Sequence, residues 1–335
     1  MTWVLSKRPA PGPWARALRL LGADRAAMLS LVLLGLITLL CVCAPLYATY
    51  VVHTDPFVSN VEGVVTVAGK SVALVQPTTE GLGLGSAPLS PTWDIRNFFL
   101  GADGQGRDVA ARLLYGGRNS LFIAATSTLL CLTLAALTGL VAGFFGGLVD
   151  TVISRFLDVL WAFPIYLLAI SLSIVLISKG FDIGPVSISA GSLALPIFII
   201  GIVYVPYVAR PIRGQVLALK ESEFVLAATA LGVPAHRILL RDILPHVMTM
   251  LIVFVPLLMA INMLTESALS FLSIGVQPPD ASWGTIIQDG TNLIYTRPMV
   301  AIAPGIAIVL TVLSLNLLGD GVRDALDPRS KLRLR

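Results

Sequence analysis

The sequence predicts an all-α membrane protein with six transmembrane helices and a small external β-hairpin and loop insertion between the first two helices. Three observations support this fold class: the composition, a set of long windows without charge, and an uneven distribution of basic residues. Hydrophobic residues make up 56% of the 335 positions and charged residues only 13%, which is far from the average of soluble domains. We therefore expect an integral membrane protein.

Six windows contain no Asp, Glu, Lys or Arg. A hydrocarbon core of about 30 Å takes roughly 20 residues of helix, so each window can cross a bilayer. Six spanning helices are the simplest interpretation. The windows are 26–54, 119–149, 159–178, 183–209, 243–265 and 298–319.

The basic residues indicate the side of the membrane on which each loop lies. The first window is too long for the core of a signal peptide, so we expect an uncleaved transmembrane helix. Because the residues that precede it are rich in Lys and Arg, we expect the N-terminus to lie in the cytoplasm. Six spans then place the C-terminus in the cytoplasm as well. The net charge of +4 needs no nucleic-acid partner, because the excess faces the anionic lipids of the inner leaflet. Outside fall only Lys70, Arg96, Arg107, Arg112, Arg118, Lys179 and Arg297.

The expected organisation follows from these spans. It comprises a cytoplasmic N-terminal segment (1–25), a first transmembrane helix (26–54), an external loop (55–118), a five-helix core (119–320) with a cytoplasmic segment inside it (214–245), and a basic cytoplasmic tail (321–335). In the external loop, residues 61–76 alternate β-branched residues around Gly69, which predicts the hairpin. Residues 107–118 return to a helical period, and we expect an amphipathic helix lying near the outer interface.

The chain carries no motif for catalysis or for binding a cofactor. Its three cysteines fall in apolar spans and its three histidines lack ligand-like spacing, so we expect no metal site. Residues 63–71 miss the spacing of a phosphate-binding loop by one residue. If ATP drives transport, ATP and Mg²⁺ therefore bind to partner subunits. Glu266 is the one ionisable candidate near a span, either as a helix-packing residue or in transport.

The segment 224–245, FVLAATALGVPAHRILLRDILP, interrupts the apolar spans with a polar cytoplasmic stretch. Strong helix formers predict a helix over 215–231. Gly232 then suits a left-handed C-terminal stop, and Pro234 suits the first turn of a second helix. The small residues Ala227 and Ala228 would let another surface approach the backbone closely.

This stretch resembles the cytoplasmic signature of ATP-binding-cassette importer permeases, which is Glu-Ala-Ala, three residues, Gly, and then about a dozen residues to Leu-Pro. Leu226 stands in the place of the glutamate. The matching positions are Ala227, Ala228, Gly232, Leu244 and Pro245.

Three further stretches narrow the resemblance. GADGQGRDVAARLLYGGRNSL, QPPDASWG and LNLLGDGVRDALDPR are similar to segments of the second permease of dipeptide and oligopeptide importers, a group that includes nickel and glutathione carriers. The resemblance covers about residues 13–329. It implies the transmembrane domain of a type I importer in the bacterial plasma membrane. Such a domain would form the path for di- or oligopeptides by alternating access.

The resemblance also implies partners and site residues. The partners are a second permease, two nucleotide-binding subunits, an extracytoplasmic solute-binding protein and membrane lipids. The short cytoplasmic helix would seat in a groove of the ATPase subunit through Glu223, Phe224, Leu226, Ala227, Ala228, Leu231 and Gly232. The external docking or gate residues would be Glu266, Gln277, Pro278, Pro279 and Trp283.

Other interpretations remain open from the sequence. The same machinery could carry nickel or glutathione instead of peptides. A secondary transporter or channel driven by ions would show charges inside the membrane and usually repeated halves. An enzyme embedded in the membrane would need catalytic residues clustered in the spans.

Overall fold

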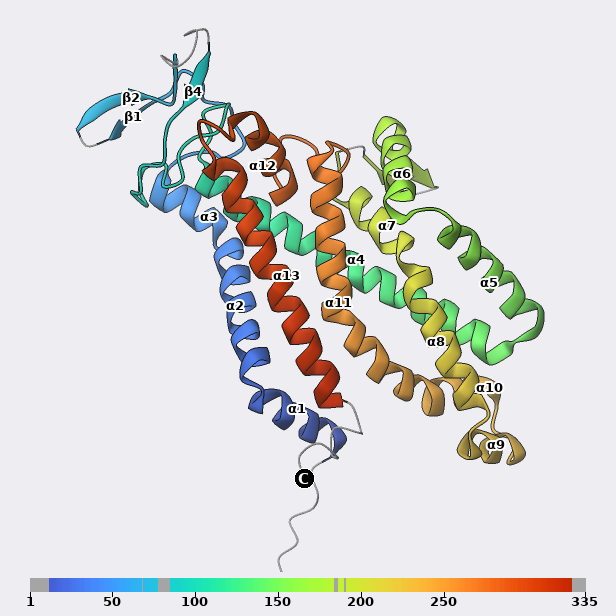
Figure 1. The fold of residues 1–335 in the computed structure, drawn as a ribbon. Coiled ribbons are helices and arrows are strands. Elements are labelled where there is room, and N and C mark those ends of the chain that lie inside the picture. The colour runs from blue at the N-terminus through green and yellow to red at the C-terminus, as the bar shows by residue number, and fades with distance from the viewer. Residues whose placement is uncertain (1–11, 68, 78–84, 184–185, 190, 327–335) are drawn as a thin grey trace, which may run out of the picture.

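The computed structural model describes residues 12–67, 69–77, 85–183, 186–189 and 191–326, which form a helical bundle with small β-ribbons at one end (Figure 1). Its helices are α1 (Pro13–Ala23), α2 (Arg25–Val42), α3 (Ala44–Leu46), α4 (Val109–Phe145), α5 (Gly147–Ala162), α6 (Ile165–Lys179), α7 (Ala194–Val203), α8 (Val205–Lys220), α9 (Glu223–Ala230), α10 (Ala235–Arg237), α11 (Leu244–Phe271), α12 (Trp283–Gly290) and α13 (Met299–Leu326). Two π-helical turns, η1 (Tyr47–Val52) and η2 (Ile238–Ile243), and one 3-10 turn, η3 (Thr291–Leu293), complete them. The strands are β1 (Val64–Val67), β2 (Lys70–Ala73), β3 (Val75–Pro77), β4 (Ser86–Pro88), β5 (Phe181–Ile183) and β6 (Val186–Ile188).

The helices confirm the predicted membrane fold. By length and composition, α2, α4, α13 and the continuous run Ala235–Phe271 can each cross a bilayer. Two further pairs qualify as bent spans: α5 with α6, bent by 90°, and α7 with α8, bent by 42°. Six spans result when each bent pair counts as one. We call the end that carries β1–β4 the outer end and the end that carries α9 the inner end (Figure 1).

Local chemistry sets where the spans begin and bend. The Asp24 carboxylate accepts from the backbone N–H of Ala26 at 2.9 Å and caps α2. Pro164 stands between α5 and α6, and the residue before it, Phe163, has an extended backbone as a pre-proline position requires. Pro164 therefore accounts for the break between α5 and α6.

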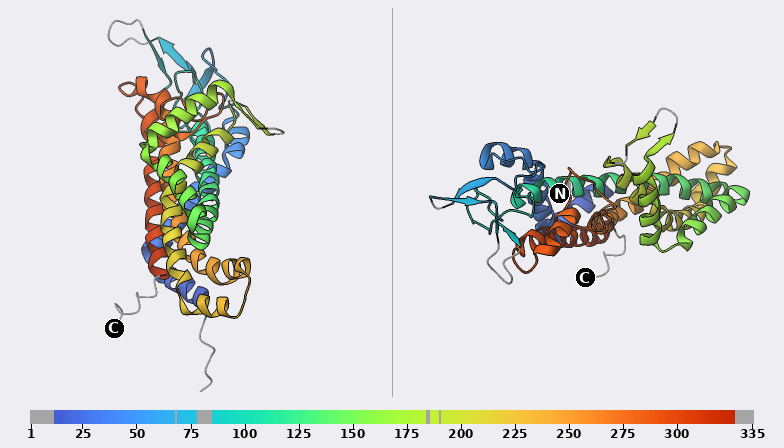
Figure 2. Two further views of the ribbon diagram at one scale, coloured as in Figure 1. Left: turned by 90° about the vertical axis from the view of Figure 1, so that its right-hand side faces the viewer. Right: turned by 90° about the horizontal axis from the view of Figure 1, so that it is seen from above.

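The long helix α4 lies at the centre of the bundle and packs against α2, α7, α8 and α11. Its glycines allow the closest approach to α8. A Cβ added at Gly139 would lie 2.8 Å from the Ile212 side chain, and one at Gly143 would lie 2.8 Å from Val216. Small residues at such positions are typical of helix contacts in membranes, where close packing replaces the hydrophobic effect. Seen from the side, the spans form a thin layer (Figure 2).

The predicted hairpin is present at the outer end. β1 and β2 are antiparallel, Val67 pairs with Lys70, and Gly69 has a φ of +79° in the turn. A second antiparallel ribbon, β3–β4, follows, whereas the sequence predicted only the one hairpin over 61–76. Leu74 and Phe98 are buried beneath these ribbons.

Three predicted elements differ from the structure. Residues 107–118 form no separate interfacial helix, because α4 begins at Val109 and runs without interruption to Phe145. The helix predicted over 215–231 is divided by a turn at Glu221 and Ser222 into α8 and α9. The window 183–209 begins with the β5–β6 ribbon, and its helix starts only at Ala194. Composition locates apolar stretches but does not show where the chain turns within them.

Candidate functional sites at the two ends of the bundle

The short helix α9 lies at the inner end, beyond the neighbouring helices (Figure 1). Gly232 terminates it with a φ of +75°, as predicted, and its N–H donates to the Thr229 carbonyl at 3.0 Å. The N–H of Val233 donates to the Ala228 carbonyl at 3.1 Å, which completes a C-terminal cap. Pro234 immediately precedes α10.

Three apolar side chains of α9 and its cap are exposed to differing degrees. Leu231 is 83% exposed, Leu226 57% and Phe224 43%. Grouped exposed apolar side chains are typical of a surface that contacts another protein or a membrane. Of the other predicted contact residues, Glu223, Ala227 and Gly232 are exposed and Ala228 is half-buried against the core.

Several contacts hold α9 firmly against the bundle. Val225 is buried in the main hydrophobic core. The Phe224 ring stacks on the His246 ring of α11, with 5.4 Å between the centroids. The Lys220 ammonium donates to the Phe144 carbonyl at the end of α4, at 2.8 Å. Val225 and Phe224 thus hold α9 against the core and α11, while Lys220, the last residue of α8, ties that helix to the end of α4.

At the outer end, Trp283 anchors α12 inside the bundle. Its side chain is 1% exposed, and its indole Nε1–H donates to the Leu113 carbonyl at 2.9 Å. Its backbone N–H donates to the Ser120 hydroxyl at 3.1 Å. A Cβ at Gly117 would lie 2.6 Å from the Trp283 ring, so α4 needs glycine there.

Glu266 lies in the same junction and is fully buried. The Ser270 hydroxyl donates to its carboxyl group at 2.7 Å, and Ser270 Oγ also accepts from the Val276 N–H at 3.0 Å. Glu266 thus fixes the segment between α11 and α12. Neither Glu266 nor Trp283 is placed to contact a soluble protein directly in this conformation, because both side chains are enclosed.

The other three predicted external residues, Gln277, Pro278 and Pro279, line a cavity of about 620 Å³ at the outer end. Arg107, Arg112 and Asp289 lie in its wall. The structure therefore divides the predicted external set into two buried anchors and three residues at an open cavity.

An ion cluster in this wall was not predicted from the sequence. Arg107 Nε donates to Asp103 Oδ2 at 2.7 Å, and Arg107 Nη2 donates to Asp289 Oδ2 at 3.0 Å. Arg112 Nη2 donates to the same Asp289 oxygen at 3.1 Å, and its Nη1 donates to the Pro56 carbonyl at 3.0 Å. The cluster ties the first external loop, α4 and α12 together. Asp103 and Arg107 are four residues apart, so the sequence could have indicated their ion pair. Nothing in the sequence indicated that Asp289, 182 positions away from Arg107, completes the cluster.

Asp108 caps α4 beside this cluster and gives a pH-dependent prediction. Its carboxylate accepts from the Ala111 N–H at 2.8 Å, and burial raises the pKa of Asp108 to about 6 despite its hydrogen bonds to the Ala111 and Ala110 N–H groups. The folded state therefore binds a proton more tightly than the unfolded state. This contribution to stability is complete below the ordinary pKa of about 3.9 and is lost as the pH rises through about 6.

Asp108→Asn should remove this dependence, because the amide oxygen can still cap α4 and no charge is buried. Above pH 6 we expect the free energy of unfolding of the variant to exceed that of the parent by about 1–3 kcal/mol. Unfolding of the protein in detergent, followed between pH 4 and pH 8, measures the difference. A parent and variant with parallel pH profiles would contradict the assignment.

In the described part of the chain, no group of three or more His, Cys, Asp or Glu residues could hold a metal ion. The expectation that this chain binds no cofactor stays a prediction.

Comparison with known proteins identifies the family. The family described as binding-protein-dependent transport system inner membrane component matches residues 135–332, and the N-terminal TM domain of oligopeptide transport permease C matches residues 12–60. The first match covers more than half of the chain. The chain therefore belongs to the inner membrane components of binding-protein-dependent transport systems.

Individual relatives agree with this family. The dipeptide transport system permease protein DppC of Alkalihalophilus pseudofirmus is 33% identical over 96% of this chain and 92% of its own length. The oligopeptide transport system permease protein OppC of Haemophilus influenzae is 31% identical over 95% of this chain and 89% of its own. The glutathione transport system permease protein GsiD of Pectobacterium atrosepticum is 38% identical over 74% and 76%.

A solved structure shows the same fold. A chain of the inward-facing MetNI methionine ABC transporter is similar with a TM-score of 0.51 and 17% identity, over 64% of this chain and 95% of that one. The fold is thus that of an ABC importer transmembrane subunit, as the sequence predicted.

Proposed function

We propose that this chain is one of two permease subunits of an ATP-driven importer for di- or oligopeptides. The observation that carries the proposal is α9, an exposed apolar surface at the inner end that is held against α8 and α11. Similarity over nearly the full length to permeases named for dipeptides and oligopeptides supports the substrate class. A peptide cannot cross hydrocarbon without a polar path, because each unpaired amide costs several kcal/mol there. A second permease would complete that path.

In this proposal two nucleotide-binding subunits supply ATP and Mg²⁺, and α9 seats in a groove of one of them. The contact relies on shape and apolar burial, because Leu226 stands where the family has glutamate and its side chain is exposed on α9. Closure of the ATPase pair would then move α11 through the Phe224–His246 contact, and α4 through α8, whose Lys220 binds the Phe144 carbonyl.

The outer end would receive an extracytoplasmic solute-binding protein. The hairpin β1–β2 and the cavity lined by Gln277, Pro278 and Pro279 form the exposed surface there. Glu266 and Trp283 would hold this surface in position from beneath. In this proposal both termini lie in the cytoplasm of a bacterium and the chain lies in its inner membrane.

Uptake in cells that lack this gene tests the proposal. We expect uptake of labelled alanyl-alanine to disappear in the deletion strain and to return when the gene is restored, with nickel and glutathione uptake unchanged. Glutathione is the second candidate, since one relative at 38% identity is named for it. Loss of glutathione uptake with normal dipeptide uptake would show that the solute is glutathione and not a dipeptide.

A further inference from the structure

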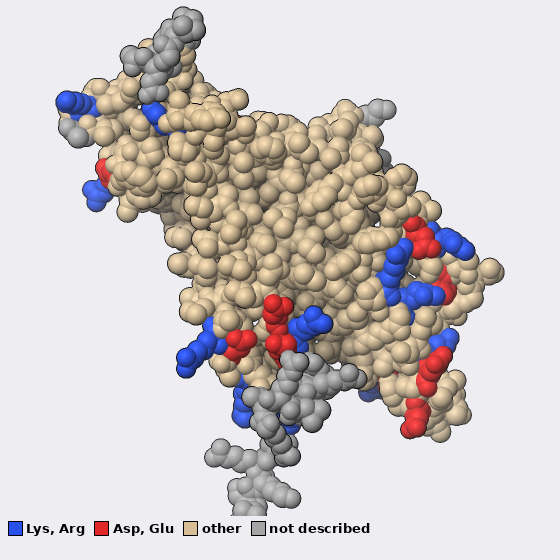
Figure 3. Space-filling model, in the orientation of Figure 1, with Lys and Arg blue, Asp and Glu red and all other residues tan. Residues whose placement is uncertain are grey.

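Charged and aromatic side chains gather on α5 and α8, which belong to the two bent spans. Arg210 Nη2 donates to Asp158 Oδ1 at 2.8 Å, and the two side chains are 43% and 51% exposed. Arg210 precedes the end of α8 by about ten residues, which is roughly 15 Å of helix. Figure 3 shows charged atoms grouped over α5 and α8 on a surface that is otherwise largely free of charge between the two ends.

This face does not fit a lipid contact. A charged side chain that faces hydrocarbon costs several kcal/mol, and charges within spans almost always face a partner or a water-filled path. Both members of the Asp158–Arg210 pair are about half exposed, so this chain alone does not cover them. The face therefore borders water or protein.

Three aromatic rings from three helices continue the surface. Trp161 of α5 stacks on Tyr207 of α8 with 6.2 Å between the centroids, and Tyr207 packs edge to face on Phe254 of α11 at 6.1 Å. The Arg210 guanidinium lies 5.5 Å from the centroid of the Trp161 ring. Such a row offers apolar faces that can bind side chains of different shape.

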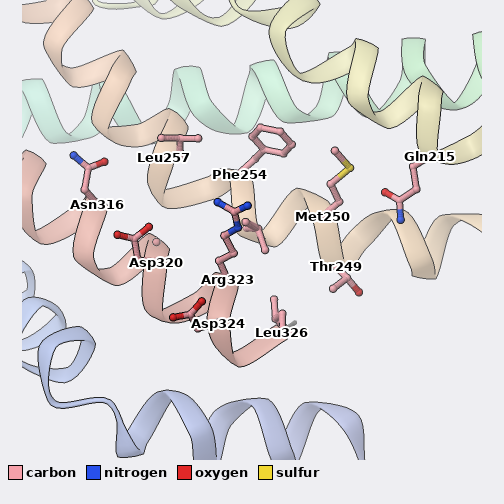
Figure 4. A pocket seen from close by; sticks show the side chains of 12 residues that line it. Gln215, Thr249, Met250, Phe254, Leu257, Asn316, Asp320, Arg323, Asp324 and Leu326 are labelled. Atoms are coloured by element: carbon pink, nitrogen blue, oxygen red, sulfur yellow. The ribbon is translucent and has the colours of Figure 1, made fainter. Parts of the chain in front are cut away.

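Phe254 joins this row to a cavity of about 710 Å³ at the inner end, between α8, α11 and α13. Figure 4 shows that Arg323 extends from α13 into the cavity toward the α11 wall, with Asp320 and Asp324 on the same side. Gln215 lies at the α8 side, and its side-chain oxygen is buried without a hydrogen-bond partner among the described residues. The cavity thus combines an apolar wall with charges of both signs.

We infer that these residues, from the Asp158–Arg210 pair through the aromatic row to the cavity, bind the transported solute as it leaves toward the cytoplasm, and that the solute is a zwitterion. We call them the exit track. Arg210 would take the carboxylate of the solute, Asp158 its ammonium group, and the aromatic rings its side chains. The inference rests on the proposed function and adds the place and the chemistry of solute binding.

The Asp158–Arg210 pair has the capacity for this role. Among the described residues, the guanidinium of Arg210 donates to Asp158 alone, so most of its five N–H donors remain available. The neighbouring pair on the same two helices differs, since Arg213 donates to both oxygens of Asp150 and Ser154 donates to Asp150 as well. Asp150–Arg213 is satisfied within the chain and serves as the matched control.

Thiol labelling of the assembled transporter tests the exit track without the solute-binding protein. Ala162 is exposed and lies one turn from Asp158, so Ala162→Cys places a reporter beside the track with little change of volume. Cys43→Ser is added because Cys43 is partly exposed and could react with the reagent, whereas Cys41 and Cys131 are buried and can stay. Inside-out membrane vesicles containing the whole complex are treated with a charged, membrane-impermeant thiol reagent, with or without alanyl-alanine.

We expect the reporter to react and about 10 mM alanyl-alanine to slow the reaction roughly fivefold or more, as weak millimolar binding would do. N-acetyl-alanyl-alanine amide, which carries no charge, should give no protection. Arg210→Gln should abolish the protection and Arg213→Gln should retain it.

An unreactive reporter, or a reaction that alanyl-alanine does not slow, would overturn the inference, because the face would then be covered by the second permease or by lipid. Equal protection by the uncharged peptide would show that binding does not depend on the charged groups of the solute, and this result would overturn the inference that the track binds a zwitterion. If the parent complex imports alanyl-alanine with ATP in these cases, the proposed function stands and the exit track alone has failed.

Discussion

Leu231→Asp is expected to abolish solute uptake by releasing the nucleotide-binding subunits from this chain. Leu231 is 83% exposed, so the substitution leaves the fold of this chain intact. In the complex it would place a carboxylate in an apolar groove in place of a buried leucine, at a cost of about 3 kcal/mol or on the order of 100-fold in affinity. Co-purification of the ATPase subunits with a tagged form of this chain measures the effect.

The control for Leu231→Asp is Tyr295→Asp, which changes an apolar residue that is 97% exposed at the outer end. This variant should retain the ATPase subunits in full. Normal co-purification and uptake with Leu231→Asp would show that the surface of α9 does not carry the contact.

Arg112→Ala is expected to lower the stability of the protein by about 3–5 kcal/mol, the usual cost of removing one partner from a buried ion pair. Arg112 is 2% exposed and reaches Asp289, Asp103 and the Pro56 carbonyl. The change leaves Asp103 and Asp289 with Arg107 alone and removes the hydrogen bond to the Pro56 carbonyl. Unfolding by denaturant in detergent micelles measures the loss.

Arg96→Gln is the control, because Arg96 is exposed and takes part in no ion pair among the described residues. An exposed change of this kind should stay within about 0.5 kcal/mol of the parent. A similar small effect with Arg112→Ala would mean that the cluster contributes little to the outer end.

Hydropathy alone predicted the spans, because each needs only an apolar stretch of sufficient length. The hairpin at β1–β2 followed from alternation around Gly69, and the stop of α9 followed from Gly232. Each of these features depends on residues that are close together in the sequence.

The junction at the outer end could not be predicted in this way. Arg112 and Asp289 are 177 positions apart, and their hydrogen bond exists only because α12 folds back onto α4. The helical period of residues 107–118 was correct, but α4 buries Arg112 where an interfacial helix would have exposed it. Trp283 lies at the outer end, but its burial against Gly117 could not be read from the sequence.

Reconstitution in liposomes tests whether this chain transports the solute only together with ATPase subunits. This chain, the second permease, the two nucleotide-binding subunits and the solute-binding protein are combined in liposomes, with ATP and Mg²⁺ on the side of α9. We predict accumulation of labelled alanyl-alanine that requires ATP and the solute-binding protein and that stops with Leu231→Asp. Accumulation by this chain alone, driven by an ion gradient without ATPase subunits, would show that it is a secondary transporter and not a subunit of an ATP-driven importer.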